Sequence, residues 1–336
     1  MPTIKDIARA AGVSYTTVSH VLNDSRPVSP KIKQSVQDAA KALNYVPSGV
    51  ARALRRRTTG TIGMLLANTA DPFFAQLVSE IEEVCFQNQV SLLLCNSYED
   101  SVRQEAHIRS LLQKRVDGLL ISAVGDFTAL VELLRKVLVP VVFVDRIPPG
   151  FDADAVTVDQ ERAGYEATRH LLELGHRRIG CITGRSNISV LPPRVGGYRR
   201  ALQEAGIKPH AHWIAEAVDL TLESGYAATE YLFNRSPGLT ALFAVTDVLA
   251  IGTMRYAYQR NLSVPGALSI IGFDGVELGR YVLPALTSIA QPIRELGASA
   301  ATYLLERIRG SRVGPGCRIV LPAKLIVRDS TGPAPL

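Results

Sequence analysis

Residues 45–57 read YVPSGVARALRRR and divide the chain into two parts of different character. Pro47 suits the first turn of a helix, and Ser48 lies beside a position where an N-cap is favoured. A helix of about two turns is marginal in water by itself. We therefore expect this stretch to become ordered on a partner, and its three final arginines favour a polyanion. The alternative interpretation is a charged linker.

The positive charge of the chain is concentrated before residue 61. Residues 1–60 carry ten Lys and Arg against three Asp and no Glu, whereas the formal net charge of all 336 residues is +6. A basic head on a nearly neutral body indicates nucleic acid bound by the head alone. An anionic lipid surface is the alternative, but no long apolar anchor accompanies the basic residues.

The head has the pattern of three short helices. Thr3 and Asp6 form the signature of a capping box, Gly12 ends the first helix, and Ser14 begins the second as its N-cap. The second helix is expected over 15–22 and the third over 30–43. Two helices joined by a glycine turn predict a helix-turn-helix, in which the start of the second helix enters the major groove. The side chains left outside its apolar face are Tyr15, Thr16, Thr17 and His20.

The body alternates apolar strands with amphipathic helices, which predicts parallel, doubly wound sheets. Two such sheets leave a cleft at the carboxyl ends of their strands, where ligands bind. Residues 286–290 and 293–309 are expected to return to the first lobe, and 330–336 to be a plain tail. Strands are expected at 61–66, 90–95, 118–122, 140–144, 178–183, 240–245 and 269–273, and helices at 73–88, 101–114, 128–138, 162–174, 194–205, 224–233 and 247–260.

The loops at the strand ends carry the candidate ligand contacts. Carboxylates and arginines pair with hydroxyl groups, and aromatic faces cover the apolar side of a sugar ring. Phe73 could instead be core, Asp247 a helix cap, and Asp145 with Arg146 an internal ion pair. The strand-end candidates are Asp71, Phe73, Phe74, Asp145, Arg146, Arg194, Leu220, Thr246, Asp274 and Gln291.

Several protein classes lack support in the sequence. We find no nucleophile elbow, phosphate loop or dinucleotide fingerprint, so we expect no enzyme, no catalytic residue and no cofactor. The cysteines at 85, 95, 181 and 317 form no metal-binding pair, so we expect no metal site and read them as buried free thiols. Neither a secretion signal nor a membrane-length apolar run is evident, which favours a cytoplasmic protein without membrane contact.

The head, with Asn44, Tyr45 and the segment after it, resembles the DNA-binding headpiece of the lactose/galactose repressor (LacI/GalR) family, and the resemblance continues to about residue 330. It implies a headpiece over 1–46, a hinge helix and linker over 47–60, and an effector-binding and dimerisation domain over 61–336. In this family two hinge helices lie in the minor groove, where the leucine at Leu54 wedges into the central base step. The DNA contacts expected are Tyr15, Thr16, Thr17, His20, Arg26, Leu54 and Arg55.

The body resembles the periplasmic sugar-binding proteins, most closely the ribose branch and its repressor counterpart. This implies a two-lobed body and maps sugar contacts onto the strand-end candidates. Leu220 replaces an aromatic residue, Thr246 and Asp71 replace asparagines, and the segment 188–193 is unusually apolar. Purine-binding members carry an arginine and a threonine where this chain has Ile188 and Val190. A pentose or related sugar is favoured, with purines, other sugars, sugar acids and organic acids as alternatives.

Together these features predict a repressor that binds a palindromic operator as a homodimer in the bacterial cytoplasm and responds to a small molecule. A sugar-binding transport protein would share the two lobes, but it would need an export signal and would not carry the basic head. The family includes induced and corepressed members, and induction is favoured here.

Overall fold

The computed structural model describes residues 2–22, 26–45, 58–122, 127–148 and 151–335. The chain divides into two compact units, Met1–Gly60 and Thr61–Leu336. The proposed hinge helix over 47–54, with Leu54 and Arg55, lies outside the described residues. Within them, no helix has both the length and the apolar character needed to cross a membrane.

The headpiece packs three helices, α1 (Ile4–Ala10), α2 (Tyr15–Leu22) and α3 (Pro30–Ala42). Asp6 accepts hydrogen bonds from the Thr3 amide and hydroxyl, which satisfies the start of α1. One residue from each helix is fully buried in the small core: Ile7, Val18 and Val36. The expected helix-turn-helix is confirmed.

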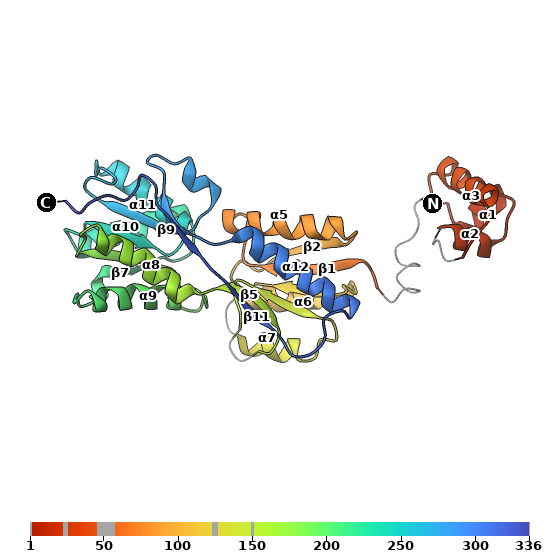
Figure 1. Cartoon of the computed structure of the whole chain (residues 1–336), viewed down its shortest axis with the longest axis horizontal. Coiled ribbons are helices and arrows are strands. Elements are labelled where there is room, and N and C mark those ends of the chain that lie inside the picture. Colours follow the sequence, from red (N-terminus) through yellow and green to blue (C-terminus); the bar gives the residue numbers. More distant parts are fainter. Residues whose placement is uncertain (1, 23–25, 46–57, 123–126, 149–150, 336) are drawn as a thin grey trace. The chain divides into compact units, whose positions relative to one another are not determined.

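The first lobe is a six-stranded parallel sheet in the order β11-β5-β4-β3-β1-β2. Helices α5 and α12 pack against each other, as do α6 and α7, and the two pairs cover opposite faces (Figure 1). The strands are β1 (Thr61–Leu66), β2 (Ser91–Asn96), β3 (Leu119–Ile121), β4 (Val141–Val144), β5 (Asp154–Val158) and β11 (Arg318–Leu321). The helices are α5 (Pro72–Gln87), α6 (Ser101–Gln113), α7 (Phe127–Leu134) and α12 (Ile293–Arg309).

The second lobe is built in the same way, with strand order β12-β10-β9-β8-β6-β7. Its strands are parallel except β12, which runs antiparallel to β10. The strands are β6 (Ile179–Thr183), β7 (Ile214–Glu216), β8 (Ala241–Ala244), β9 (Ser269–Asp274), β10 (Thr287–Ala290) and β12 (Lys324–Ile326). The helices are α8 (Gln160–Glu173), α9 (Leu191–Glu204), α10 (Leu222–Arg235) and α11 (Asp247–Gln259), with short turns η1 (Ala211–Trp213) and η2 (Glu277–Arg280).

The described chain passes between the lobes three times: from β5 to α8, from β10 to α12, and from β11 to β12. Each passage spans only a few residues, so these segments are where the angle between the lobes is set. The structure confirms the expected fold class, an all-α helix-turn-helix headpiece and a two-lobed α/β body with two mostly parallel sheets.

Two expectations for the C-terminal region are wrong. Strand β10 belongs to the second lobe, where it pairs with β9, although we assigned this segment to the first. The end of the chain is no plain tail. The Ser330 hydroxyl donates to the Ile270 carbonyl at 2.6 Å, and His176 Nε2 lies 3.0 Å from the Gly332 carbonyl oxygen. These hydrogen bonds attach the end of the chain to the second lobe.

Smaller differences concern element limits and one thiol. Helix α9 begins at Leu191, three residues earlier than expected, so part of the apolar segment 188–193 is its first turn. Strands β5 and β7 were not anticipated. Thr246, and not Asp247, caps α11, because its hydroxyl accepts the Leu249 amide. Cys317 is exposed and Cys95 is only half-buried, whereas the sequence predicts buried thiols.

Candidate functional site

The outer face of α2 carries the residues expected to contact DNA. Tyr15 is 54% exposed and Thr16 is exposed, whereas Thr17 and His20 are half-buried. The Thr17 amide donates to Ser14 Oγ at 3.1 Å, and the two hydroxyls lie 2.8 Å apart. Thr17 therefore helps to hold the turn before α2. Tyr15 and Thr16 are more exposed and so better placed to contact DNA.

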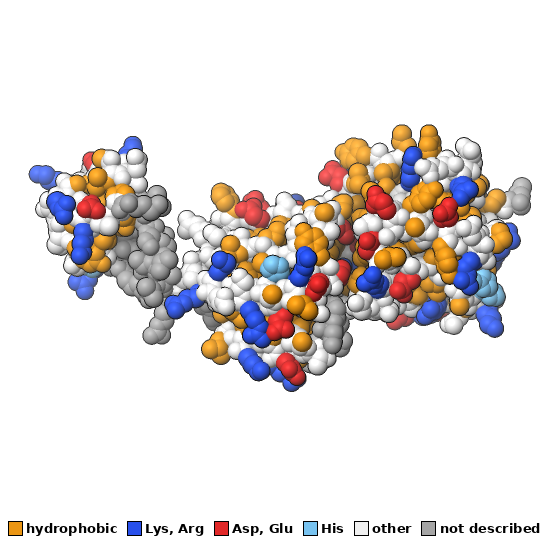
Figure 2. Space-filling view, turned by 180° about the vertical axis from the view of Figure 1, so that it is seen from behind, with side chains coloured by type: hydrophobic (Ala, Val, Ile, Leu, Met, Phe, Trp, Pro, Cys, Tyr) orange, Lys and Arg blue, Asp and Glu red, His pale blue; other side chains and the backbone are white. Residues whose placement is uncertain are grey.

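The headpiece also carries exposed basic side chains. All six Lys and Arg of the described headpiece residues are exposed, and several lie on the face shown in Figure 2. Such residues suit contacts to phosphates, which position a protein on DNA without reading its sequence. These exposed basic residues are Lys5, Arg9, Arg26, Lys31, Lys33 and Lys41.

The candidate ligand residues of the body meet where the two sheets face each other with their carboxyl strand ends. They line a cavity of only about 20 Å³, which has room for roughly one water molecule. The two lobes thus leave little space between their strand ends. Its lining contains nine of the ten expected residues, Asp71, Phe73, Phe74, Asp145, Arg146, Arg194, Leu220, Thr246 and Asp274, together with Val190 and Leu191.

On the first-lobe side, the start of α5 supplies a carboxylate and two aromatic rings. Asp71 caps the helix, because its Oδ1 accepts the Phe73 amide at 2.9 Å. Phe73 and Phe74 are buried and meet edge to face, with ring centroids 5.2 Å apart. An aromatic wall beside a capped carboxylate suits a ligand that has an apolar face and polar edges.

Arg194 on α9 is the central cation of the second-lobe side. Its side chain is almost fully buried, with the guanidinium carbon 3.6 Å from the Phe273 ring centroid. The Nη1 atom donates to the Val245 carbonyl at 2.6 Å. Helix α9 approaches α8 closely here, since a Cβ atom on Gly164 would clash with the Arg194 carbonyl oxygen. The glycine therefore helps to place Arg194 in the cleft.

Asp145 and Arg146 follow β4 and are both buried. Asp145 has φ +62°, an uncommon value for a residue other than glycine. Its Oδ1 accepts a long hydrogen bond of 3.4 Å from Gln160 Nε2, at the start of α8. The Arg146 guanidinium carbon lies 5.2 Å from the Phe74 ring centroid, so it covers one side of the aromatic wall.

Asp274 ends β9 in a strained turn. Its φ is +111° and that of Gly275 is +73°. Gln291 Nε2 donates to Asp274 Oδ1 at 2.9 Å, so Gln291, the tenth expected residue, contacts the lining although it is not part of it. Asp247 lies behind this turn and fixes it: its Oδ2 accepts the Val276 amide at 2.8 Å and its Oδ1 accepts the Ser288 hydroxyl at 2.6 Å.

Burial dominates the electrostatics of the cleft. It raises the pKa of Asp71, Asp145 and Asp274 above the usual value for a carboxyl group, although nearby arginines oppose this shift. Burial also raises the pKa of Asp247 to about 7. Three carboxyl groups and two guanidinium groups line the cavity.

Sequence reasoning missed several contacts. Gln160 accepts from Arg194 Nε at 2.8 Å, and Glu99 accepts from Arg146 Nη1 at 2.6 Å. Phe273 belongs to an expected strand-end loop, and the structure places its ring against the Arg194 guanidinium. Glu99 follows β2, so the rule that located the other candidates could have found it. Val190 and Leu191 were noticed only as part of an apolar segment, because their place depends on where α9 begins.

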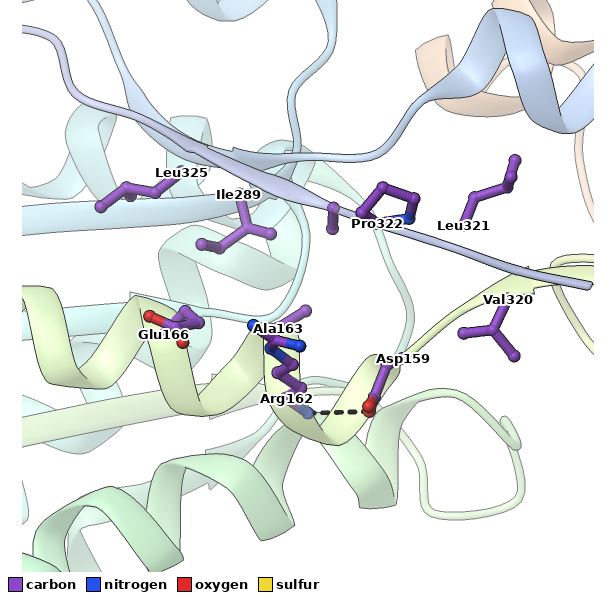
Figure 3. Close-up of a pocket in the computed structure, with 10 residues that line it drawn as sticks. Asp159, Arg162, Ala163, Glu166, Ile289, Val320, Leu321, Pro322 and Leu325 are labelled. Carbon is purple, nitrogen blue, oxygen red and sulfur yellow. Dashed lines mark hydrogen bonds between the residues drawn. The ribbon is translucent and has the colours of Figure 1, made fainter.

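A larger cavity of about 420 Å³ lies outside this cleft (Figure 3). It separates the first turns of α8, with Asp159, Arg162 and Glu166, from the segment that joins β11 to β12. The Arg162 amide donates to Asp159 Oδ1 at 3.0 Å. Two of the three passages between the lobes border it, and its apolar wall is Ile289, Val320, Leu321, Pro322, Ala323 and Leu325.

Comparison with known families matches almost the whole chain. Residues 59–327 match the model described as periplasmic binding proteins and sugar binding domain of LacI family. Residues 3–48 match the model described as bacterial regulatory proteins, lacI family. Among the residues that the structure describes, no three His, Cys, Asp or Glu side chains are arranged to hold a metal ion.

Individual relatives extend this likeness. The chain is 40% identical over 330 residues to the ribose operon repressor of Haemophilus influenzae, covering 98% of each chain. It is also 40% identical over 311 residues to the HTH-type transcriptional repressor PurR of Aliivibrio salmonicida, covering 92% of this chain and 93% of that protein.

Two solved structures are similar as well. The lac repressor dimer bound to operator and the anti-inducer ONPF superposes with a TM-score of 0.88 at 30% identity, covering 98% of this chain and 99% of that one. A LacI family regulator from Enterococcus faecium with bound ribose gives a TM-score of 0.72 at 32% identity, covering 81% of this chain and 99% of that one.

Proposed function

The chain belongs to the LacI family of transcriptional repressors, and we propose that this member binds a palindromic operator as a homodimer and is released from it by a pentose or related sugar. Its relatives are DNA-binding repressors with an effector-binding domain and are not enzymes. A repressor of this kind acts where the chromosome lies, in the bacterial cytoplasm.

The gathering of Asp71, Asp145, Arg146, Arg194 and Asp274 at one cavity carries the sugar proposal. Carboxylates accept hydroxyl protons, guanidinium groups donate to hydroxyl oxygens, and the neighbouring phenylalanine pair can cover a ring face. The lining offers more carboxyl than guanidinium groups, which suits a ligand rich in hydroxyl groups better than a sugar acid, sugar phosphate or organic acid. A neutral polyol fits this combination of groups best.

A purine corepressor is the second candidate. Two proteins named PurR are each 40% identical to this chain, as is the ribose operon repressor, so overall similarity favours neither ligand. The apolar side chains Val190, Leu191 and Leu220 could also cover a flat base. Against this, purine-binding members carry polar side chains at the positions of Ile188 and Val190, both of which are buried and apolar here.

Exposed apolar side chains support the homodimer. In the first lobe they include a group on α5, on the edge strand β2 and just after it, where Phe86 is 73%, Leu94 40% and Tyr98 57% exposed. In the second lobe they include a group just after η2, where Tyr281 is 72% and Leu283 93% exposed. Large exposed apolar groups of this kind mark association surfaces.

Sedimentation velocity tests this surface. Leu283→Asp should shift the protein toward monomer, because a carboxylate would be buried in the interface. Leu138→Asp is the matched control: Leu138 is fully exposed after α7 and belongs to neither group, so its change should leave the dimer intact. A dimer that tolerates Leu283→Asp would assign the interface elsewhere.

We propose that the switch is a thermodynamic linkage between the cleft and the operator. Effector and operator favour different angles between the lobes, so binding of one lowers the affinity for the other by a reciprocal factor. In this proposal the hinge helix transmits the change of angle to the DNA through the Leu54 wedge.

Leu54→Ala should abolish tight operator binding in an anisotropy titration while leaving effector affinity unchanged. Unchanged operator affinity would remove the wedge from the mechanism.

A thermal-melt screen tests the effector proposal. The panel contains pentoses, hexoses, polyols, sugar acids and purines. A ligand at about a hundredfold its Kd stabilises the folded state by roughly 2.7 kcal/mol, which raises the melting temperature by several degrees. Stabilisation by a pentose that also releases operator DNA supports the proposal. Stabilisation by a purine that tightens operator binding supports corepression, and a response to acids alone contradicts the charge argument.

A further inference from the structure

The loop between β2 and α6, residues 97–100, holds an unusual backbone conformation. Tyr98 has φ +53° and Glu99 has φ +59°, two consecutive left-handed values without a glycine. Both ends of the loop are anchored. The Tyr98 amide donates to the Ala67 carbonyl at 2.8 Å, and Asp100 caps α6 by accepting the Val102 and Arg103 amides. The anchored turn directs the Glu99 side chain toward Arg146.

Two carboxylates lie near the Arg146 guanidinium, and the nearer one belongs to a residue that is distant in the sequence. Its Nη1 lies 2.6 Å from Glu99 Oε1, whereas its Nε lies 3.7 Å from Oδ2 of the adjacent Asp145. The second distance is too long for a hydrogen bond. Glu99 therefore takes the hydrogen bond of Arg146 Nη1, and Asp145 has only a longer ion pair with the same guanidinium.

Several buried polar atoms beside the cavity have no hydrogen-bond partner among the described residues. Arg146 Nε and Glu99 Oε2 are buried without a hydrogen-bond partner among the described residues. On the opposite lobe Gln291 Oε1 is in the same condition. Asp145 itself accepts a long hydrogen bond from Gln160 and lies 3.7 Å from Arg146 Nε. Buried groups without partners are costly, which makes them good candidates to receive a ligand.

We propose that Glu99 is a positioning residue for the effector. It draws the Arg146 guanidinium away from Asp145, so that the Asp145 carboxylate and Arg146 Nε remain free to share one ligand hydroxyl. A hydroxyl group both donates and accepts, and so it can satisfy an acceptor and a donor placed side by side. Without the Glu99 carboxylate, Arg146 would turn onto Asp145 and occupy the place of that hydroxyl.

This inference rests on the proposed sugar function, which it deepens by naming the residue that keeps the first-lobe subsite open. A purely structural ion pair is the competing explanation, in which Glu99 and Arg146 merely hold the loop 97–100. The two explanations differ in what happens to Arg146 when the negative charge is removed but the loop stays folded.

Glu99→Gln tests the inference, because it removes the charge and nearly keeps the side-chain shape. In a crystal structure of the variant, we expect the Arg146 guanidinium within about 3.2 Å of the Asp145 carboxylate, the limit of a hydrogen bond. A guanidinium that keeps its wild-type place would overturn the inference. This comparison with the wild-type crystal needs no ligand.

Calorimetric titration with D-ribose measures the effect of the same substitution on ligand affinity. Glu99→Gln should lower the affinity about tenfold. Asp100→Ala is the matched control, because it removes the α6 cap in the same loop without touching Arg146. The control should lower the melting temperature and leave ribose affinity unchanged. Equal loss of affinity in both variants would mean that the pair only holds the loop.

The two proposals fail in distinguishable ways. Absence of D-ribose binding to the wild-type protein would count against the pentose, and the crystallographic comparison would still decide the role of Glu99. Ribose binding that is unaffected by Glu99→Gln would leave the sugar proposal intact and refute the positioning role.

Discussion

Arg194 Nε donates to Gln160 Oε1 at 2.8 Å, while Nη1 of the same guanidinium lies 3.5 Å from Asp274 Oδ1. Gln160 is the first residue of α8, just after the chain passes from β5 into the second lobe. One arginine thus joins a passage between the lobes, the end of β9 and the cavity wall.

Arg194→Ala should therefore destabilise the body and abolish effector binding. Removing one partner from a buried ion pair leaves the other charge uncompensated, at a cost of about 3–5 kcal/mol. Arg200→Ala on the same helix is the control: its bond to Glu161 is exposed, so its loss should cost at most about 1 kcal/mol. Urea denaturation measures both. Similar losses in the two variants would contradict the central role of Arg194.

The raised pKa of Asp247 predicts that the free energy of unfolding falls as the pH rises. Burial raises its folded-state pKa to about 7, above the unfolded value near 4. The folded state therefore binds more protons between these two pKa values, and this contribution to stability is lost as the pH rises through about 7. Urea denaturation between pH 5 and pH 8 should show a smaller fall with rising pH in Asp247→Asn than in the wild type. Identical pH profiles would contradict the assignment.

The end of the chain should be required for a stable second lobe. Deleting residues 330–336 would remove partners of Ile270, Thr287 and His176, and each buried group left without a hydrogen bond costs about 1–3 kcal/mol. At roughly 2–4 °C per kcal/mol, the melting temperature should fall by several degrees. Deleting only 335–336 is the control, since the Ala334 amide keeps its bond to the Leu174 carbonyl. Equal melting temperatures of both truncations and the wild type would refute the prediction.

On the DNA side, Thr16→Ala should weaken specific operator binding and leave its salt dependence unchanged. Thr16 is exposed on α2 and is expected to face base edges, where a lost contact costs roughly 1–3 kcal/mol. Lys33→Ala is the contrasting variant, because a lost phosphate contact reduces the salt slope and weakens binding to all sequences alike. Anisotropy titrations at several salt concentrations separate the two. A changed salt slope in Thr16→Ala would assign that residue to the backbone.

Strand-end reasoning from the sequence located most of the cleft, because parallel strands place their carboxyl ends together whatever the details of packing. Asp71, Asp145 and Asp274 were therefore predictable. Glu99 also follows a strand, but its contact with Arg146 depends on two consecutive left-handed residues that no glycine marks. Phe273 lies at an expected strand end, but its stacking against Arg194 depends on side-chain packing. The assignment of β10 failed because a single strand carries no mark of which sheet it will join. The C-terminal residues looked plain because their buried partners, such as His176, lie far away in sequence.

The small volume of the cavity, about 20 Å³, also has a consequence for rates. No effector larger than about a water molecule fits inside it, so capture must wait until the lobes part around their three connecting segments. Hinge motions of this kind take microseconds to milliseconds. The observed association rate will consequently stop rising with effector concentration once opening becomes the slow step, and that plateau is the frequency at which the cleft opens. How quickly a cell senses the effector is thereby bounded by the three short connections between the lobes, however favourable the contacts inside the cleft.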